Sequence, residues 1–533
     1  GEQRVYVRTR SLDYKIYEDR IYSKWSPIKG VVVETTIYPV PFGHIREHRI
    51  ESRDFYRAYE CGFAVAKSEP KYECIVKNGC VLVQNICQFC KVESVMEKED
   101  TRQIGTPYVI PADPNTNVLY KNTVIPAVVF EIQPGITVIR TQVEIRWEFE
   151  QNKRITETEI KEALETAVSQ SEFALSKFGT RFKHIFSSNQ FYTEAQNNQW
   201  TNGFWTGELW LAYEYSGDRK FLETAMAHTK SFRSRAENRV ETDTHDLGFL
   251  YSPYCVAAYK LTGDAEARKT ALMAADMLLE RFHEKGQFLQ AWGALNEPGN
   301  YRLIIDCLLN LPLLYWASEE TGDSNYKEKA DAHIHTALKV LIRPDYSAYH
   351  TFFFDPETGE PERGVTHQGY SAESAWSRGQ AWGIYGIALS YRYTRKAEYI
   401  DLFDHVAEYF LEHLPKNLIP YWDFIFTDGS DEPRDSSSAA IATCGMLEMA
   451  KYLDGEKQEF YINAAKRLMK ALYDNCAVKD TKISDGQLLH GVYGRKTPYN
   501  DCIDHGIDEC NLWGDYFYVE GLMRLYKEWN PYW

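Results

Sequence analysis

The stretch Ser216-Gly217-Asp218 recurs in the second half of the sequence and decides its fold. Equivalent helix-breaking turns, each followed by an amphipathic helix, stand at Thr262-Gly263-Asp264, Thr321-Gly322-Asp323, Thr394-Arg395-Lys396 and Asp454-Gly455-Glu456. The central position advances by 46, 59, 73 and 60 residues, so each unit is a helical hairpin. An opening helix near 159–178 and a closing helix at 513–529 bring the expected number to twelve. Six hairpins that close on themselves predict an (α/α)6 toroid with the more apolar helices inside.

The first part of the chain has a different sequence pattern. From Gly30 to about Trp147, alternating β-branched and aromatic residues predict strands, as at 31–38, 56–65, 127–132 and 135–145. A chain of 533 residues is too long for one hydrophobic core. We therefore expect a multidomain protein, with an antiparallel β-sandwich-like domain at 1–150 and a catalytic (α/α)6 barrel at 151–533.

Composition excludes several classes of partner. The chain has 60 Lys and Arg against 76 Asp and Glu, a formal charge of −16, which argues against nonspecific binding to nucleic acid or to an anionic membrane. The longest apolar run, 304–317, is interrupted by polar residues, so we expect no membrane span and a soluble protein. Residues 1–10 carry no signal-peptide core, and periplasm and cytoplasm both remain open as locations.

Eleven cysteines, an odd and low count, exclude a fully paired disulfide scaffold. The pair Cys87-x-x-Cys90 is compatible with a zinc site, but the surrounding sequence is more typical of strands that bury cysteine as a small apolar residue. No pattern elsewhere indicates a metal, a glycine-rich phosphate loop or a nucleophile elbow. We expect no cofactor and no metal.

The repeat also locates a site. A polar or aromatic residue stands 16–18 residues before each turn, near the start of each inner helix: Trp200, Asp246, Asp306, Arg378 and Ser437, with Trp513 at the same place in the last helix. Equal offsets put these side chains at one height, so they should converge at one mouth of the toroid. The alternative is that each residue is only a helix cap or a first-turn residue.

Asp306 is the most informative of these residues. It lies in Leu303–Asn310, an apolar stretch read as a helix in which Arg302, Asp306 and Asn310 form one polar stripe. Apolar surroundings raise the pKa of a carboxyl group and suit a general acid, although Arg302 would act in the opposite direction. A buried structural carboxylate is the alternative. Asp246, preceded by His245, is the expected partner, and two opposed carboxylates suit sugar chemistry.

Aromatic and hydrogen-bonding residues near the expected mouth agree with a sugar ligand. The aromatic residues are Trp200, Trp205, Trp292, Trp376, Trp382, Trp513 and Tyr516, of which we expect three or four to contact ligand and the rest to be core. The donors are His350, His367, Gln368 and Arg378, and the planar fork of arginine suits a carboxylate.

Six motifs in order resemble glycoside hydrolase family 88, the unsaturated glucuronyl hydrolases. They are Trp200-Thr-Asn-Gly-Phe-Trp-Thr-Gly, His245-Asp-Leu-Gly-Phe-Leu-Tyr-Ser-Pro, Ile305-Asp-Cys-Leu-Leu-Asn-Leu, Thr366-His-Gln-Gly-Tyr, Trp376-Ser-Arg-Gly-Gln-Ala-Trp and Glu509-Cys-Asn-Leu-Trp-Gly-Asp-Tyr-Phe-Tyr. The resemblance covers about residues 160–533.

The resemblance implies that Asp306 is the general acid and base and Asp246 the second essential carboxylate. The residues expected to bind substrate are Trp200, His245, His350, His367, Gln368, Trp376, Arg378, Trp382, Trp513 and Tyr516. The implied substrate is an oligosaccharide whose non-reducing end is a 4,5-unsaturated glucuronic acid, left by a polysaccharide lyase acting upstream. The implied chemistry is hydration of the C4=C5 enol ether, followed by loss of the aglycone, without a cofactor.

A loop at 490–499 leads toward Trp513, and in relatives of this family it flanks the sugar after the cleaved bond. Arg495 and Lys496 are therefore candidate sulfate contacts, with solvated surface charge as the alternative. The source polysaccharide, the sulfate position and the oligomeric state are not readable from the sequence. Rival functions are a conventional inverting glycosidase or a sugar epimerase on the same toroid, and a non-catalytic glycan-binding protein.

The motifs at 42–50 and 58–65 resemble the C-terminal β-sandwich of an uncharacterised (α/α)6 family of bacterial polysaccharide-degrading proteins. That resemblance implies that the chain is the end of a longer fusion with a further module upstream, and that the sandwich serves packing rather than binding.

Overall fold

The computed structural model describes residues 154–533 except Asn296, together with the strands of the first 146 residues. Within those first strands, side chains are described only for residue 24 and for residues near 31–36 and 47–51. Contacts between Cα atoms divide the chain into two compact units, Gly1–Phe149 and Glu150–Trp533, which are described separately.

The first unit contains two antiparallel sheets. The larger has the order β1-β2-β3-β4-β13-β9-β8-β7 with β10 on β9, and the smaller has the order β11-β12-β5 with β6 on β12. The larger sheet comprises β1 (Asp13–Ile16), β2 (Ile21–Trp25), β3 (Val31–Val40), β4 (Gly43–Ser52), β7 (Glu73–Lys77), β8 (Cys80–Gln84), β9 (Phe89–Lys98), β10 (Thr101–Ile104) and β13 (Gly135–Arg146). The smaller comprises β5 (Tyr56–Cys61), β6 (Val65–Ala66), β11 (Thr106–Ile110) and β12 (Thr123–Ile132), and it contacts β7, β8 and β9.

The strands expected from the sequence are present in this unit. In β3 alternate residues are buried, among them Val31 and Val33, as a half-buried strand requires. Cys80 and Cys90 lie in strands β8 and β9, whereas Cys87 lies outside the described residues. The positions of Cys80 and Cys90 agree with the strand interpretation of this cysteine-rich stretch.

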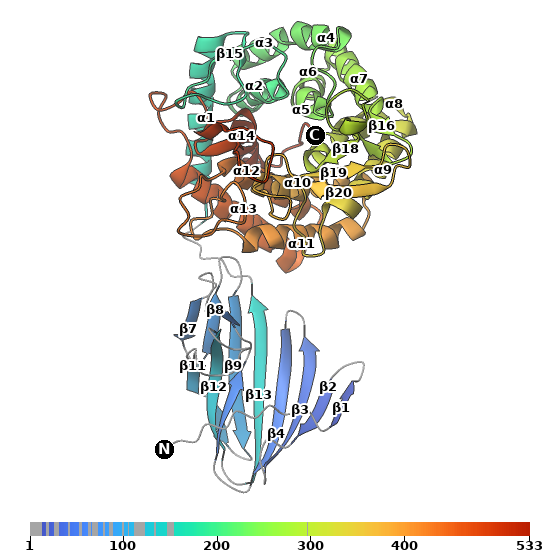
Figure 1. Cartoon of the computed structure of the whole chain (residues 1–533). Coiled ribbons are helices and arrows are strands. Elements are labelled where there is room, and N and C mark those ends of the chain that lie inside the picture. The colour runs from blue at the N-terminus through green and yellow to red at the C-terminus, as the bar shows by residue number, and fades with distance from the viewer. Residues whose placement is uncertain are drawn as a thin grey trace. The chain divides into compact units, whose positions relative to one another are not determined.

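The second unit is mostly helical. Its inner helices are α2 (Asn202–Ser216), α5 (Leu247–Tyr251) continuing through a π-helical turn (Ser252–Val256) into α6 (Ala257–Thr262), α8 (Leu311–Thr321), α10 (Ser377–Thr394), α12 (Ser436–Ala450) and α14 (Leu512–Tyr526). Its outer helices are α1 (Glu157–Phe178), α3 (Arg219–Ala227), α4 (Thr229–Glu237), α7 (Ala265–Leu279), α9 (Ser324–Leu341), α11 (Glu398–Glu412) and α13 (Gly455–Asn475). Each inner helix contacts the next, and α14 contacts α2, so the inner helices close a ring (Figure 1).

Burial explains which helices lie inside. Every residue of α12 is buried, whereas α11 buries only one stripe, including Phe403 and Phe410, and leaves the rest partly or fully exposed. A helix that is apolar on all sides is stable only when other elements surround it. The alternation of the two kinds along the chain therefore produces one inner and one outer layer.

The repeated tripeptide joins the two layers. Gly217, Gly263 and Gly322 follow inner helices with φ of 71°, 73° and 78°, a left-handed conformation that glycine adopts without strain. The aspartate that follows each glycine accepts a hydrogen bond from the first turn of the next outer helix, as Asp264 does from the Ala267 amide at 2.7 Å. Each tripeptide thus ends one helix and starts the next.

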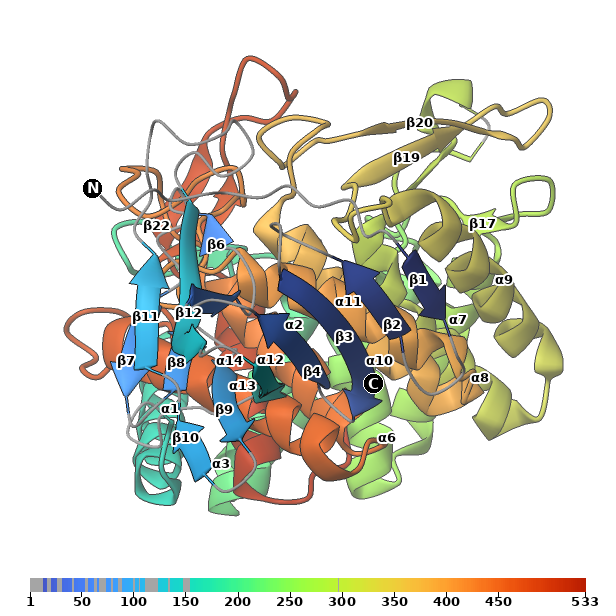
Figure 2. The ribbon, with the colours of Figure 1, turned by 90° about the horizontal axis from the view of Figure 1, so that it is seen from below.

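Short strands gather at one end of the ring. They are β14 (Phe182–Lys183), β15 (Glu194–Ala195), β16 (Phe282–His283), β17 (Phe288–Leu289), β18 (Arg302–Ile304), β19 (Thr351–Phe354), β20 (Pro361–Val365), β21 (Gly491–Gly494) and β22 (His505–Glu509). In Figure 2, β17, β19, β20 and β22 lie along the upper edge, at the end from which the inner helices start. None of the described helices has the length and apolar character needed to cross a bilayer.

One expected helix is wrong. Leu303–Asn310 does not form a helix with a polar stripe; residues 302–304 are strand β18, and Ile305–Leu309 form a 3-10 helix. Pairing with β19 competes successfully with helix formation at this apolar sequence, because short apolar runs fit either structure. Arg302, Asp306 and Asn310 therefore face different surroundings.

The left-handed glycines allow a stability test. A Cβ added at Gly217, Gly263 or Gly322 would meet no atom within 4 Å, so Ala substitution introduces backbone strain without a clash. We expect each substitution to cost about 1–2 kcal/mol and to lower the thermal unfolding midpoint by about 2 °C, with the triple variant showing roughly the sum. Gly299→Ala, which also has open space but no positive φ, is the matched control and should cause no decrease. A triple variant as stable as the parent would contradict this role of the glycines.

Candidate active site

Two carboxylates and one imidazole meet where two inner helices begin. Asp246 is the N-cap of α5, and Asp306 lies in the 3-10 helix that leads into α8. Nε2 of His245 lies 3.2 Å from Oδ1 of Asp306 and 3.5 Å from Oδ1 of Asp246. The two aspartate side chains are 12% and 18% exposed, so solvent reaches both, whereas His245 is buried. This group, called here the Asp–His–Asp cluster, is the centre of the candidate site.

Backbone pairing fixes the segment that carries Asp246. Thr244 pairs with Trp292 in an antiparallel bridge, and the His245 amide donates to the carbonyl of Ala291 at 2.8 Å. The Thr244 hydroxyl donates to Oδ2 of Asp246 at 2.7 Å. The first carboxylate of the cluster is therefore held from the backbone and from its own turn.

Asn310 ties the two aspartate segments together. Its side chain accepts from the Phe249 amide at 2.8 Å and donates to the Asp306 carbonyl at 3.2 Å. The approach requires Gly248, because a Cβ there would lie 2.4 Å from Cα of Asn310. Asn310, which was predicted to share a polar stripe with Asp306, thus sets the distance between the two carboxylates.

The charges in the cluster depend on one another. Burial raises the pKa of Asp246 to about 6, with a further rise from the Asp306 charge and an opposing effect of His245. Burial alone would lower the pKa of His245, but the adjacent Asp306 and Asp246 raise it well above its usual value. The cluster therefore holds an imidazolium between two carboxyl groups, of which Asp246 is protonated more readily.

The expected rise in the pKa of Asp306 is wrong. Burial does raise it, but the charge and the hydrogen bond of His245, with a contribution from His350, lower the pKa below its usual value. Arg302 is not the opposing charge, because its guanidinium lies over the Trp292 ring at 3.7 Å. No local sequence pattern directs His245 at Asp306, because the two residues belong to different hairpins.

An aromatic wall adjoins the cluster. The Trp200 and Trp513 rings stack at 5.3 Å, and Nε1 of Trp200 donates to the Tyr493 hydroxyl at 3.1 Å. Nε1 of Trp513 donates to the Ser437 hydroxyl at 2.9 Å. Trp200 keeps partial exposure whereas Trp513 is fully buried, so Trp200 is the member of the pair that a ligand reaches.

Arg378 supports this wall from behind. It is 2% exposed, and its guanidinium donates to the Asp435 carboxylate at 2.5 Å and to the carbonyls of Val492 and Tyr493 at 2.5 and 2.9 Å. It also lies 4.8 Å from the Trp513 ring. Sequence reasoning offered Arg378 as a donor to a substrate carboxylate, but the carboxylate that it holds is that of Asp435. Arg378 is a positioning residue.

Two histidines and Gln368 extend the site on the other side of Asp306. Nε2 of His350 lies 3.3 Å from Oε1 of Gln368, and its ring lies 4.8 Å from that of Trp376 and 6.1 Å from that of His367. Burial lowers the pKa of His350 to about 4, so it is neutral near pH 7. Gln368 donates to the Tyr493 carbonyl at 2.9 Å, which joins this side to the aromatic wall.

Two predicted ligand contacts lie in the apolar interior instead. Trp382 is 1% exposed and packs against Phe249 and Phe517, and Tyr516 is fully buried between Phe204 and Phe517. Inner helices are apolar on all sides, so an aromatic residue one turn further along the helix falls into the core. The sequence pattern does not indicate whether an aromatic residue of an inner helix lies at the mouth of the ring or in its apolar core.

The candidate sulfate residues lie on the loop after β21. Arg495 is paired with Glu432 at 3.4 Å and with Asp504 at 3.3 Å, whereas the Lys496 side chain is exposed. Sequence reasoning about this loop missed Tyr493, which contacts Trp200, and it missed Asp435, which precedes α12. Asp435 directly precedes an inner helix, as Asp246 does, and this position would have identified it as a candidate from the sequence.

Within the part of the chain that the structure describes, the Asp–His–Asp cluster is the only group of three such residues able to hold a metal ion, with donor atoms within 4.8 Å of one another. The same ring nitrogen of His245, Nε2, lies near both carboxylates, an arrangement suited to sharing a proton. The absence of a metal remains a prediction from the sequence.

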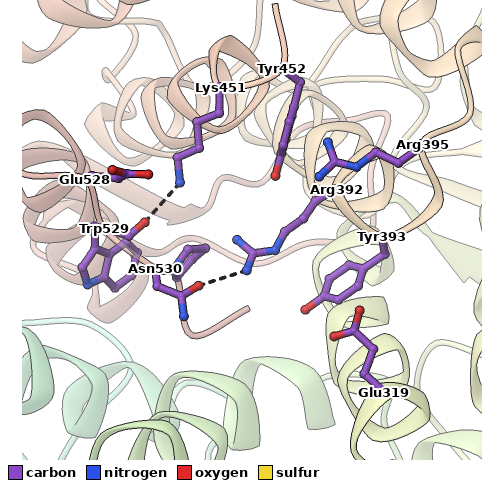
Figure 3. Close-up of a pocket in the computed structure, with 10 residues that line it drawn as sticks. Glu319, Arg392, Tyr393, Arg395, Lys451, Tyr452, Glu528, Trp529 and Asn530 are labelled. Carbon is purple, nitrogen blue, oxygen red and sulfur yellow. Dashed lines mark hydrogen bonds between the residues drawn. The ribbon is translucent and has the colours of Figure 1, made fainter. Parts of the chain in front are cut away.

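A cavity of about 590 Å³ lies at the other ends of the inner helices, where α8, α10 and α12 finish (Figure 3). Lys451 donates to the Trp529 carbonyl at 3.1 Å, and Arg392 donates to the Asn530 side chain at 3.0 Å. The cations therefore hold residues 529–530, and the cavity is distinct from the candidate active site.

Comparison with known proteins identifies both parts of the chain. The family model of Glycosyl Hydrolase Family 88 matches residues 176–514, and that of the DUF2264 C-terminal domain matches residues 4–144. An unsaturated chondroitin disaccharide hydrolase of Streptococcus pneumoniae is 48% identical over 382 residues, which cover 71% of this chain and 95% of that protein.

Solved structures agree. The crystal structure of unsaturated glucuronyl hydrolase from Streptococcus agalactiae matches with a TM-score of 0.68 and 46% identity, covering 72% of this chain and 98% of that chain. A mutant from the same organism complexed with dGlcA-GalNAc6S matches with a TM-score of 0.63 and 44% identity over the same shares. Both resemblances drawn from the sequence motifs are confirmed. Through its helical unit, the chain belongs to Glycosyl Hydrolase Family 88.

Proposed function

We propose that this chain is an unsaturated glucuronyl hydrolase. It removes 4,5-unsaturated glucuronic acid from the non-reducing end of oligosaccharides by adding water across the C4=C5 bond. The observation that carries the proposal is the Asp–His–Asp cluster beside the partly exposed Trp200, in a chain of this family. The relatives' disaccharide substrates support a chondroitin-type disaccharide as the ligand.

Asp306 delivers the proton in this proposal. Its carboxylate and the His245 imidazolium share one proton across 3.2 Å, and that proton passes through Asp306 to C4 of the sugar. Protonation places positive character on C5 and on the ring oxygen. Asp306, now without the shared proton, then accepts a proton from the water that attacks C5.

The bond to the aglycone breaks after hydration. The water oxygen adds to C5, and one water proton returns to the Asp–His–Asp cluster. The cluster thereby regains the proton that it gave to C4. The resulting hemiketal opens at the bond between C5 and the ring oxygen to give a ketone, which leaves C1 as a hemiacetal. That hemiacetal collapses to an aldehyde and releases the aglycone as an alcohol. One water is consumed, no electrons leave the substrate, and no sugar ester with the protein forms.

Carboxylate separation opposes the conventional inverting alternative. Inverting glycosidases hold their two carboxyl groups about 6.5–9.5 Å apart, which leaves room for a water. In the Asp–His–Asp cluster the donor atoms lie within 4.8 Å of one another. This spacing supports a proton shared in one place over an acid and a base on opposite sides of the sugar.

A proposal on the domains accompanies the function. We infer that residues 1–150 form a β-sandwich-like domain, separate from a catalytic (α/α)6 barrel at 151–533. The contact between the two antiparallel sheets supports the first part, and the closed ring of inner helices supports the second.

The mechanism predicts a strict need for the alkene. The protein should bleach the ultraviolet absorbance of an unsaturated glucuronyl disaccharide and act poorly on its saturated analogue, which has no double bond to protonate. Asp306→Asn keeps the shape but cannot supply the proton, so kcat should fall by about 10²-fold to 10⁴-fold while binding persists. Equal rates on the two sugars would establish conventional hydrolysis instead. Full activity of the Asp306→Asn variant would show that Asp306 has a structural role and is not the proton donor.

The pKa of Asp246 predicts how activity depends on pH. Below about pH 6 Asp246 is protonated, and the cluster is neutral with one imidazolium and one carboxylate. Above pH 6 a second carboxylate forms and repels the substrate's own carboxylate, so kcat/KM should fall as pH rises through about 6. Thr244→Val removes a hydrogen bond that favours ionised Asp246, so the fall should move to higher pH. An unmoved profile in that variant would assign the titration to another group.

The loop after β21 predicts sulfate preference. Since Arg495 is paired with Glu432 and Asp504 while Lys496 is exposed, Lys496 is the stronger candidate. Replacing both with Ala should reduce kcat/KM on sulfated unsaturated disaccharides more than on unsulfated ones, with Lys496→Ala alone giving most of the difference. An equal loss on both substrates would identify them as ordinary surface charges.

A further inference from the structure

A row of alternating cations and aromatic rings runs outward from the candidate active site along the sheet β18-β19-β20. Arg302 in β18 is the register partner of Phe353 in β19, and Phe353 is the register partner of Arg363 in β20. Directly paired residues of neighbouring antiparallel strands point to the same face. These three side chains, called here the Arg–Phe–Arg row, therefore form one line across the sheet.

The contacts within the row are close. The Arg302 guanidinium lies 5.4 Å from the Phe353 ring, and that of Arg363 lies 4.7 Å from the same ring. Arg363 is about half exposed, and its ion pair is with its neighbour Glu362, an exposed contact that contributes little. The outer end of the row is thus a solvent-accessible cation beside an aromatic face.

The inner end of the row joins the site. The Arg302 guanidinium lies 3.7 Å from the Trp292 ring, and Trp292 in turn lies 5.8 Å from the His367 ring. Trp292 is 39% exposed and is paired through its backbone with Thr244, two residues before Asp246. Nη1 of Arg302 donates to the Gly299 carbonyl at 3.0 Å, whereas its Nε is buried without a hydrogen-bond partner, so packing against Trp292 and Phe353 and this one acceptor hold the guanidinium.

We propose that the Arg–Phe–Arg row, together with Trp292, binds the sugars that follow the first disaccharide in longer, anionic unsaturated oligosaccharides. This inference rests on the proposed function and extends it from disaccharides to longer chains. Arginine forks suit carboxylate and sulfate groups, and aromatic faces pack against sugar rings. Arg302 and Arg363 stand two strand spacings apart, about 9.6 Å. Arg302 is only 8% exposed and supports the row from within, so the half-exposed Arg363 is the cation that an acidic group of the sugar chain reaches.

The acidic side chains near the row are already in ion pairs, as Glu362 is with Arg363 at 2.5 Å. The nearby Asp501 carboxylate is occupied by Nδ1 of His367 at 2.6 Å. Figure 2 shows β19 and β20 at the upper edge of the helical unit, and the row crosses these strands. In this proposal a disaccharide bound at the Asp–His–Asp cluster does not extend to the row, whereas a hexasaccharide does.

The test compares substrate lengths. Unsaturated di- and hexasaccharides from a chondroitin lyase digest are given to the parent protein, Arg363→Ala, Arg363→Glu and the control Arg219→Ala, whose exposed side chain lies on outer helix α3. We expect kcat/KM for the disaccharide to be unchanged in all four. For the hexasaccharide it should fall about threefold to tenfold in Arg363→Ala and further in Arg363→Glu, through KM, with a smaller difference at 0.5 M salt. The control should match the parent on both.

Two outcomes would overturn the proposal. One is an unchanged hexasaccharide to disaccharide ratio in both Arg363 variants, and the other is a parent protein that bleaches the disaccharide but not the hexasaccharide. If the parent bleaches neither sugar, the proposed function itself fails. Phe353→Ala gives an independent check, because it should alter the same ratio without a change of charge, and disaccharide activity reports that the variant is folded.

Discussion

Two carboxyl groups that lie side by side and are largely shielded from water require a shared cation or proton, and His245 meets that requirement for Asp246 and Asp306. The imidazole lies between two helix starts that are 60 residues apart in sequence. Its position depends on the bridge between Thr244 and Trp292, and the distance between the aspartates depends on Asn310. The ring of helices therefore serves to bring these few contacts into register.

The ring does this through repetition of one local device. Left-handed glycine ends each of three inner helices, and the aspartate after it caps the next outer helix, so the hairpins return to the same end. Inner helices then present their N-terminal ends together, and the first turns carry the chemistry. Behind them, Arg378 and Asp435 form a buried ion pair that holds the Tyr493 loop against the aromatic wall. Such a pair fixes geometry rather than adding much stability.

Sequence reasoning succeeded where a single period or a single offset carried the information. The turns at Gly217, Gly263 and Gly322 were readable because they repeat, and the offset before them located Asp246 and Asp306. It failed where tertiary contacts decide the outcome. Leu303 and its neighbours pair with β19 instead of forming a helix, and Trp382 and Tyr516 lie too deep in apolar helices to reach a ligand. The pKa of Asp306 depends on His245, a contact that no local pattern encodes.

An overall charge of −16 and an anionic substrate are compatible because recognition depends on local charge. Arg302, Arg363 and Lys496 are all carried by segments at the end of the ring where the inner helices start, and the exposed Arg363 and Lys496 point their charge to solvent. The charge of buried Arg378, by contrast, is neutralised by its ion pair with Asp435. A cation is available to a ligand where it stays exposed, as Arg363 does beside its exposed partner Glu362, and not where a buried carboxylate already holds it. On that criterion the short strands and loops, rather than the helices that make up most of the unit, decide which acidic sugar is accepted.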